Sequence, residues 1–289
     1  MKSHTCLIAG PLILDQLGDQ PDILGGGGFY AAAAAAPFAL SQLWTRAGDL
    51  DGSLRRVITA RHIDEAGIAY EGTPYRHHPD QGLQGHGPFL AAGEPVSTED
   101  LACALLIHLP FDEWQRARAA CAQLHNQVAH TLISAPHPQD IIAEPSYLAT
   151  CCQESGAIIL PAHCAMRATS CADPLSAARV LQDMGAKIVC LSAGVLGGLA
   201  CYQQKITTWH SLPTTVKDAT GIGASFAGAL CGSIAEHGKC DWRTLKRALA
   251  QASAVASLCA SGIGPKKLLS CNRSDYTERF TKLRRNAKT

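Results

Sequence analysis

Two glycine-rich segments carry the residues most able to do chemistry in this chain. In the first, four consecutive glycines (Gly25, Gly26, Gly27 and Gly28) precede an alanine-rich run. Such a run lets the backbone approach a substrate closely, and it fits equally well a turn packed against a sheet. In the second, residues 218–228 (DATGIGASFAG), a glycine turn leads directly into a predicted helix. Because the first amides of a helix lack intrahelical acceptors, this second segment predicts a site for an anion such as phosphate.

The elements that must position these segments alternate along the chain. Short apolar runs are followed by amphipathic stretches of ten to fifteen residues, which is typical of βαβ units and a mostly parallel sheet. Residues 194–202 are expected to form a hairpin. The other predicted strands are 6–14, 102–109, 130–134, 157–160 and 187–192, and the predicted helices are 30–40, 54–66, 113–127, 174–184, 225–236 and 242–259.

One stretch, residues 73–97, does not fit this alternation. It is rich in glycine, proline and histidine, so we expect a surface loop or a partial lid. Its His77, His78 and His86, with Asp80, could bind a metal, although a solvated loop explains them more simply. We therefore predict one domain over residues 1–289 with an excursion at 73–97.

Composition excludes several classes of protein. The chain has 289 residues, 47% hydrophobic and 17% charged, which is enough for a large buried core and excludes a disordered chain. A net charge of +1 provides no footprint for nucleic acid or an acidic membrane surface. The longest apolar run, residues 29–40, is too short to span a bilayer, and no targeting signal precedes the first strand, so we expect a cytoplasmic protein.

Thirteen cysteines are many for such a chain, but no C-x-x-C pair is present. The odd count argues against a complete disulfide framework. Reduced thiols packed as small hydrophobic residues explain the pattern best, and a redox or metal role is the alternative.

Together the two glycine-rich segments resemble signatures of the ribokinase-like (PfkB) sugar and nucleoside kinases. Residues 25–28 resemble the N-terminal Gly-Gly motif of the family, and residues 218–226 resemble its D-T-x-G-A-G-D-x-F motif. Residues 46–52 and 190–198 keep the order of further family segments. The resemblance implies a three-layer α/β/α fold with a mostly parallel central sheet, a reduced or irregular lid, and a cleft at the carboxyl ends of the strands.

The resemblance also implies roles for individual residues. Asp15, expected at the end of the first strand, would lie with the four glycines and Tyr30 on the phosphate-acceptor side. The loop residues Gly221, Ile222 and Gly223 would form the anion hole. The nucleotide side would contain Gly194, Gly197, Asp218 and Thr220.

The same resemblance implies ligands. An active member would use ATP and Mg²⁺, with a nucleotide and a small hydroxylated substrate, a sugar or a nucleoside, as partners. A homodimer or a protein partner is conceivable, but residues 73–97 lack the clean alternation expected of a lid strand that clasps a second copy.

Three departures from the family pattern concern catalysis. Ala224 stands where active members have the aspartate that accepts the proton of the acceptor hydroxyl. The N-x-x-E motif that organises magnesium in the family is absent after residues 157–160, where the sequence reads PAHCAMR. Tyr30 stands near a position where many members have an asparagine that touches the substrate.

Ala224 has three interpretations. It is a replacement in a working kinase, or the mark of a natural pseudokinase that keeps a nucleotide-binding cleft, or a position whose role another residue has taken. The well-kept motif at 218–226 favours the first interpretation, and the missing N-x-x-E favours the second. The two leading hypotheses are therefore an impaired or non-catalytic binding protein and an ATP-dependent kinase of a sugar or nucleoside hydroxyl.

Overall fold

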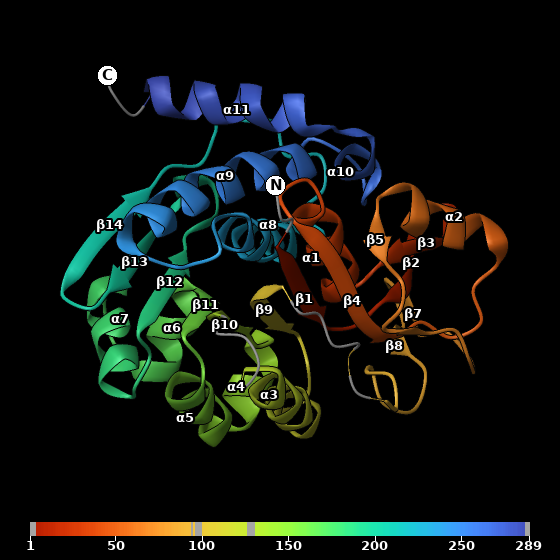
Figure 1. The fold of residues 1–289 in the computed structure, drawn as a ribbon, viewed down its shortest axis with the longest axis horizontal. Helices are drawn as coiled ribbons and strands as arrows, with labels where there is room; N and C mark the ends of the chain where they lie inside the picture. The colour runs from red at the N-terminus through yellow and green to blue at the C-terminus, as the bar shows by residue number, and fades with distance from the viewer. Residues whose placement is uncertain (1–3, 94, 96–99, 126–130, 287–289) are drawn as a thin grey trace.

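A ten-stranded, mostly parallel sheet forms the centre of the molecule in the computed structural model, which describes residues 4–93, 95, 100–125 and 131–286 (Figure 1). Its order is β14-β13-β12-β11-β10-β9-β1-β4-β5, and β6 also pairs with β4. All pairs are parallel except β12–β13 and β13–β14. The strands are β1 (Thr5–Ala9), β4 (Leu40–Arg46), β5 (Ile63–Asp64), β6 (Ile68–Ala69), β9 (Leu101–Ile107), β10 (Thr131–Ala135), β11 (Ala157–Pro161), β12 (Ile188–Ser192), β13 (Gly198–Tyr202) and β14 (Lys205–Trp209).

Helices cover both faces of this sheet, which makes three layers (Figure 1). One face is covered by α1 (Gly27–Ala35), α8 (Ile222–His237) and α9 (Trp242–Ala260), with α10 (Lys266–Ser270) and α11 (Arg273–Asn286) packed on α9. The other face is covered by α3 (Phe111–His125), α4 (Pro138–Ala143), α5 (Pro145–Glu154), α6 (Ala162–Thr169) and α7 (Pro174–Asp183). The expected three-layer α/β/α fold is therefore confirmed.

Strand β1 shows how the two cores arise. Its side chains alternate between the sheet faces, as strand geometry requires. Cys6 and Ile8 lie in the core under α1, α8 and α9, whereas Leu7 and Ala9 lie in the core under α3, α5 and α7. A strand that is buried on both faces has a continuous run of apolar residues, and this run is what predicted β1.

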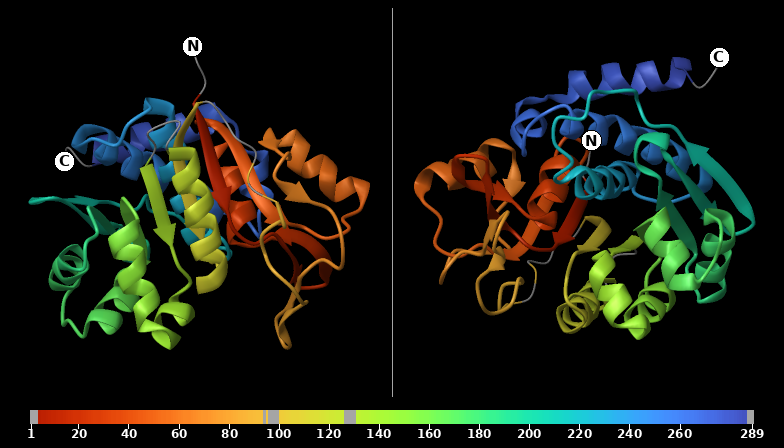
Figure 2. Two further views of the ribbon diagram at one scale, coloured as in Figure 1. Left: turned by 60° about the horizontal axis from the view of Figure 1, so that its bottom comes forward. Right: turned by 180° about the vertical axis from the view of Figure 1, so that it is seen from behind.

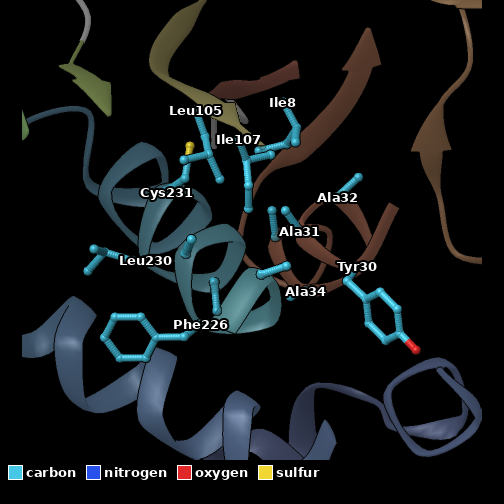
Figure 3. Close-up of a cluster of buried hydrophobic side chains, with 14 of the residues drawn as sticks. Ile8, Tyr30, Ala31, Ala32, Ala34, Leu105, Ile107, Phe226, Leu230 and Cys231 are labelled. Atoms are coloured by element: carbon cyan, nitrogen blue, oxygen red, sulfur yellow. The ribbon is translucent and has the colours of Figure 1, made fainter. Parts of the chain in front are cut away.

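Helices α1 and α8 lie in direct backbone contact (Figure 3). A Cβ atom added to Gly228 would lie 2.0 Å from the carbonyl oxygen of Ala31, and one added to Gly232 would lie 2.7 Å from that of Ala35. The alanine-rich sequence of α1 and the glycines of α8 are thus needed for this close approach. The contact brings the first turns of the two helices, and with them both glycine-rich segments, to the same edge of the sheet.

The single strand predicted at residues 6–14 is wrong, because the chain leaves the central sheet after Ala9. Pro11 has no N–H to continue the ladder, and the N–H of Leu12 donates instead to Oγ1 of Thr45 at 3.2 Å. The chain then enters β2 (Ile13–Leu17), which belongs to a different sheet. Asp15 is therefore in the middle of a second strand and not at the end of the first.

That second sheet has four strands in the order β3-β2-β7-β8 and lies beside the central sheet (Figure 2). Residues 73–97, expected to form a surface loop or a partial lid, contribute two of these strands, so the loop alternative is wrong for this part. Residues 94, 96 and 97 lie outside the described residues. Pairing with β2, which is distant in sequence, supplies the partner that the local pattern did not reveal. The strands are β3 (Gln20–Gly25), β7 (Arg76–His78) and β8 (Gly82–Gln84).

The helix predicted at 54–66 is also shorter than expected. Helix α2 runs from Gly52 to Ala60, and His62 then takes a left-handed φ of 59° before β5. Its start is set by Asp51, whose carboxylate accepts the N–H groups of Ser53 and Leu54. Asp51 therefore acts as the N-cap residue of α2.

The cysteines are mostly buried, as predicted. Cys171 and Cys240 are partly exposed, and the other eleven of the thirteen are buried. Within the described part of the chain, no helix is long and apolar enough to cross a membrane.

Candidate phosphate and acceptor site

The carboxyl ends of the parallel strands form one edge of the sheet, and both glycine-rich segments meet there. Gly10 follows β1, and the carbonyl oxygen of Pro11 accepts the N–H of Gly28 at 2.9 Å, which seats the start of α1 at this edge. The ring of Tyr30 in turn lies against Gly221, the residue that precedes α8. The start of α8 therefore shares the edge where open parallel sheets bind ligands.

The four glycines of the first segment are each closely approached by the protein itself. An added Cβ would lie 1.9 Å from Oδ2 of Asp15 at Gly25, 2.4 Å from the Pro11 carbonyl oxygen at Gly26, 2.6 Å from Nδ1 of His108 at Gly27, and 2.4 Å from the Gly10 carbonyl oxygen at Gly28. Gly26 also has a φ of 89°, which disfavours any other residue. Packing therefore accounts for all four glycines, and it holds the segment against Asp15 and His108.

Asp15 is 5% exposed, and its Oδ1 lies 3.5 Å from Nδ1 of His77. The two residues face each other because β2 and β7 pair in a register that joins Asp15 to His77. Burial raises the pKa of Asp15; His77 opposes this shift, whereas the negative charge of Asp218 adds to it. His77 thus belongs to a sheet beside a buried carboxylate, and its neighbour His78 contacts Gln16 at 2.7 Å.

Asp218 clamps the second glycine-rich segment. Its Oδ1 accepts the N–H of Thr220 at 2.9 Å, and its Oδ2 accepts the N–H of Gly264 at 2.8 Å. The N–H of Lys217 donates to the carbonyl oxygen of Ala260, so two bonds tie this loop to the end of α9. Burial pushes the pKa of Asp218 upward, but the two amide bonds outweigh it, and the pKa is lowered. A charged carboxylate that accepts a hydrogen bond on each oxygen is suited to fix the conformation of this loop.

The start of α8 combines open space with unused amides. Gly221 has a φ of 74°, and the N–H of Ser225 donates to its carbonyl oxygen, so the amides of Gly223 and Ala224 lie in the first turn without intrahelical acceptors. A Cβ added to Gly223 would meet no atom within 4 Å. The N–H of Ile222 contacts the carbonyl oxygen of Ala219 at 3.4 Å. This arrangement has the room and the donors that an anion needs.

Ala224 itself is 4% exposed and lies among the buried residues of the core beneath α1, α8 and α9. Its methyl group has no proton-accepting atom. At this position, α8 therefore offers backbone amides and the helix dipole, and the side chain of residue 224 offers no base.

The loop after β12 is connected to α8 through Trp209. A Cβ added to Gly197 would lie 2.0 Å from the carbonyl oxygen of Trp209, whose ring stacks on Phe226 in α8 with centroids 5.2 Å apart. Gly194 opens a short 3₁₀ turn, η1 (Gly194–Leu196), and has no neighbour within 4 Å of an added Cβ. The hairpin expected at 194–202 begins only after this turn and is formed by β13 and β14, which extend it to Trp209. The turn leaves two apolar side chains strongly exposed, Val195 at 74% and Leu196 at 79%.

Sequence reasoning missed two histidines at the same edge. His108 directly follows β9 in a left-handed conformation, and its ring meets that of His137, the residue that caps α4 after β10, with centroids 5.2 Å apart. Burial, with a smaller contribution from His137, lowers the pKa of His108 to about 4. A polar residue within two positions of the end of a buried parallel strand was the available signal: His108 directly follows β9, and His137 follows β10 after Pro136.

The residues after β11 test whether magnesium suits this edge. Ala162, His163, Cys164 and Ala165 begin α6 there, and Nε2 of His163 lies 3.2 Å from Sγ of Cys164. Magnesium prefers oxygen ligands, so these side chains do not fit it. In the described ranges, no group of three or more His, Cys, Asp or Glu residues is arranged to hold a metal ion.

Comparison with known proteins identifies the fold. No protein-family model matches the chain, and no curated protein matches it significantly in sequence. Solved structures do match. The aminoimidazole riboside kinase of Salmonella enterica, complexed with aminoimidazole riboside and an ATP analogue, gives a TM-score of 0.77 at 16% identity over 96% of this chain and 99% of that chain.

Two further kinases give similar values. The fructokinase of Vibrio cholerae, bound to fructose, ADP and calcium, has a TM-score of 0.75 at 16% identity, covering 96% of this chain and 99% of that chain. The nucleoside kinase of Burkholderia thailandensis, in complex with inosine, has a TM-score of 0.73 at 18% identity, covering 96% and 98%. The chain therefore has the ribokinase-like fold, as the two glycine-rich segments implied.

Proposed function

We propose that the chain is a kinase-like protein that binds a nucleotide or phosphate at the start of α8 and transfers phosphoryl groups slowly or not at all. The observation that carries this proposal is the buried methyl group of Ala224 in the first turn of α8. General-base assistance contributes roughly 10²–10⁴ in rate, or about 3–5 kcal/mol. A side chain that accepts no proton forgoes this contribution.

Binding is supported independently of catalysis. The amides of Gly223 and Ala224 face no intrahelical acceptor, and Asp218 holds the preceding loop through two hydrogen bonds. The exposed Val195 and Leu196 provide an apolar surface on which the base of a nucleotide would rest. The side of Asp15 and the four glycines corresponds to the acceptor subsite of a kinase, where a sugar or a nucleoside would be recognised only if its volume is left free.

Magnesium has no role in this proposal, since the residues after β11 are unsuited to it. Because there is neither a base at position 224 nor a carboxylate directly after β11, a nucleotide would bind without transfer of its phosphoryl group. Such a protein would serve as a subunit or regulator that responds to the nucleotide.

The experiment compares binding and turnover in the same protein. Titration calorimetry with ATP and ADP measures affinity, and release of ADP in the presence of Mg²⁺, with sugars and nucleosides as acceptors, measures turnover. We expect measurable nucleotide affinity without turnover. Turnover at ordinary kinase rates, of order 1–100 per second, would contradict the proposal.

A second candidate function, an active kinase whose aspartate has been replaced, is favoured by the intact clamp of Asp218 around the loop. Ala224→Asp separates the two, with Ala224→Asn as the matched control of similar size that cannot act as a base. We expect both variants to bind nucleotide and neither to turn over. Turnover in Ala224→Asp but not in Ala224→Asn would favour the active kinase.

A further inference from the structure

Tyr30 occupies the middle of the candidate site. Its ring lies so close to Gly221 that a Cβ added there would be 2.2 Å from Cδ1 of the ring. The residue is 1% exposed although it begins the alanine-rich part of α1. Figure 3 shows its ring pointing away from the packed cluster between α1 and α8. The side chain therefore fills space outside the main helix contact, at the entrance to α8.

The hydroxyl of Tyr30 is buried and has no hydrogen-bond partner in the described part of the chain. A buried polar group without a partner is costly, and native structures usually retain one for a reason. Burial raises the pKa of Tyr30, and the nearby groups of Cys259, Asp15 and Asp218 raise it further. The charges of both carboxylates therefore act on the phenol, and one of them, Asp218, accepts the N–H of Gly264, the residue that lies beside the hydroxyl.

The hairpin of β2 and β3 closes over this space. A Cβ added to Gly264 would lie 2.4 Å from Cδ1 of Leu17 and 3.8 Å from the hydroxyl oxygen of Tyr30. At the tip of the hairpin, Nζ of Lys266 donates to Oε1 of Gln20 at 2.7 Å. The hairpin that carries Asp15 is therefore in contact with the segment bonded to Asp218, and Tyr30 lies beneath both.

We propose that Tyr30 fills the acceptor subsite with its own ring and so excludes sugars and nucleosides from it. This inference rests on the proposed function, because that function defines the acceptor side. With the ring in place, a pentose, a hexose or a ribonucleoside cannot sit between Asp15 and the start of α8. The phenol takes the volume of such a ligand, and its unpartnered hydroxyl stands where the ligand would offer a hydroxyl of its own.

The test removes the ring and measures acceptor binding by calorimetry with D-ribose, D-fructose and inosine. We expect no measurable binding to the unaltered chain or to Tyr30→Phe, which keeps the ring. Tyr30→Ala, which removes it, is expected to bind at least one of the three with a gain of tenfold or more. An unaltered chain that binds as tightly as Tyr30→Ala, or a folded Tyr30→Ala that gains none of the three, would overturn the inference.

Two controls keep the result interpretable. Tyr30→Leu keeps apolar packing at smaller volume, and it replaces Tyr30→Ala if that variant does not fold by circular dichroism. ADP binding is measured for every variant in parallel. If none of the proteins binds ADP but a variant gains acceptor binding, the proposed function is contradicted and the role of Tyr30 is supported. If all of the proteins bind ADP but no variant gains acceptor binding, the proposed function is supported and the role of Tyr30 is contradicted.

Discussion

The carboxylate of Asp15 lies 3.5 Å from Nδ1 of His77, across the pairing of β2 with β7. The contact joins a buried carboxylate to His77, a residue that the local sequence pattern assigns to a surface loop. It also makes the second sheet part of the candidate site, because Asp15 packs against the first glycine-rich segment: a Cβ added to Gly25 would lie 1.9 Å from Oδ2 of Asp15. The protonation of Asp15 therefore depends on the second sheet being formed.

His77→Ala is expected to raise the pKa of Asp15. Burial already raises this pKa, and His77 is the group that opposes the shift. Carboxyl ¹³C chemical shifts followed through a pH titration measure it directly. His78→Ala is the matched control, since His78 contacts Gln16 and leaves Asp15 untouched. An Asp15 pKa that falls, or stays the same, in His77→Ala would show that the two groups do not interact.

Asp218→Ala is expected to destabilise the protein by about 2 kcal/mol, because two amides lose a charged acceptor. The pKa of Asp218 is lowered in the folded protein, so its contribution is present above the unfolded pKa of about 3.9 and is lost as pH falls through the folded value. Urea unfolding at pH 7 measures the loss, and nucleotide affinity should fall with it. Asp183→Ala, an exposed change on the opposite face of the sheet, should change neither quantity.

Gly221 and Gly223 are expected to respond differently to valine. Gly221→Val forces a β-branched residue into a φ of 74° and against the Tyr30 ring, which should cost about 3 kcal/mol of stability. Gly223→Val meets open space, so its stability should change by less than about 1 kcal/mol.

Nucleotide affinity completes this comparison. Gly223→Val should lower it at least tenfold, because the added methyl groups enter the space next to the free amides. Thermal unfolding and calorimetry on the same samples measure both effects. Full nucleotide affinity in a folded Gly223→Val protein would move the phosphate site away from the start of α8.

Stability is expected to rise with pH between about 4 and 6.5 because of His108. Its pKa in the folded protein is about 4, since burial and then His137 disfavour the charged ring. The unfolded chain therefore binds more protons in this window, and protonation favours unfolding as pH falls. The full effect is at most about 3 kcal/mol. His108→Gln should flatten the dependence measured by urea unfolding at several pH values, and a folded-state pKa near 6.5 by NMR would contradict it.

The sequence by itself determined the class of fold and the glycine turn that leads into α8, because both depend on neighbours along the chain. Continuous apolar runs, such as residues 6–9, mark strands buried on both faces, and their alternation with helices predicts a parallel sheet. Asp51 and Asp173 cap α2 and α7 through bonds to residues two or three positions away. The turn at Gly221 and the helix that follows it are local in the same sense.

Only the tertiary structure decided what surrounds the site. Asp15 is buried because β2 pairs with β7, more than sixty residues later, and strand periodicity does not specify the partner of a short strand. Tyr30 meets Gly221 because α1 and α8 pack backbone to backbone across nearly two hundred residues of sequence. Close packing and strand pairing between distant segments depend on the whole fold, so the surroundings of Asp15 and Tyr30 were not accessible to a local pattern.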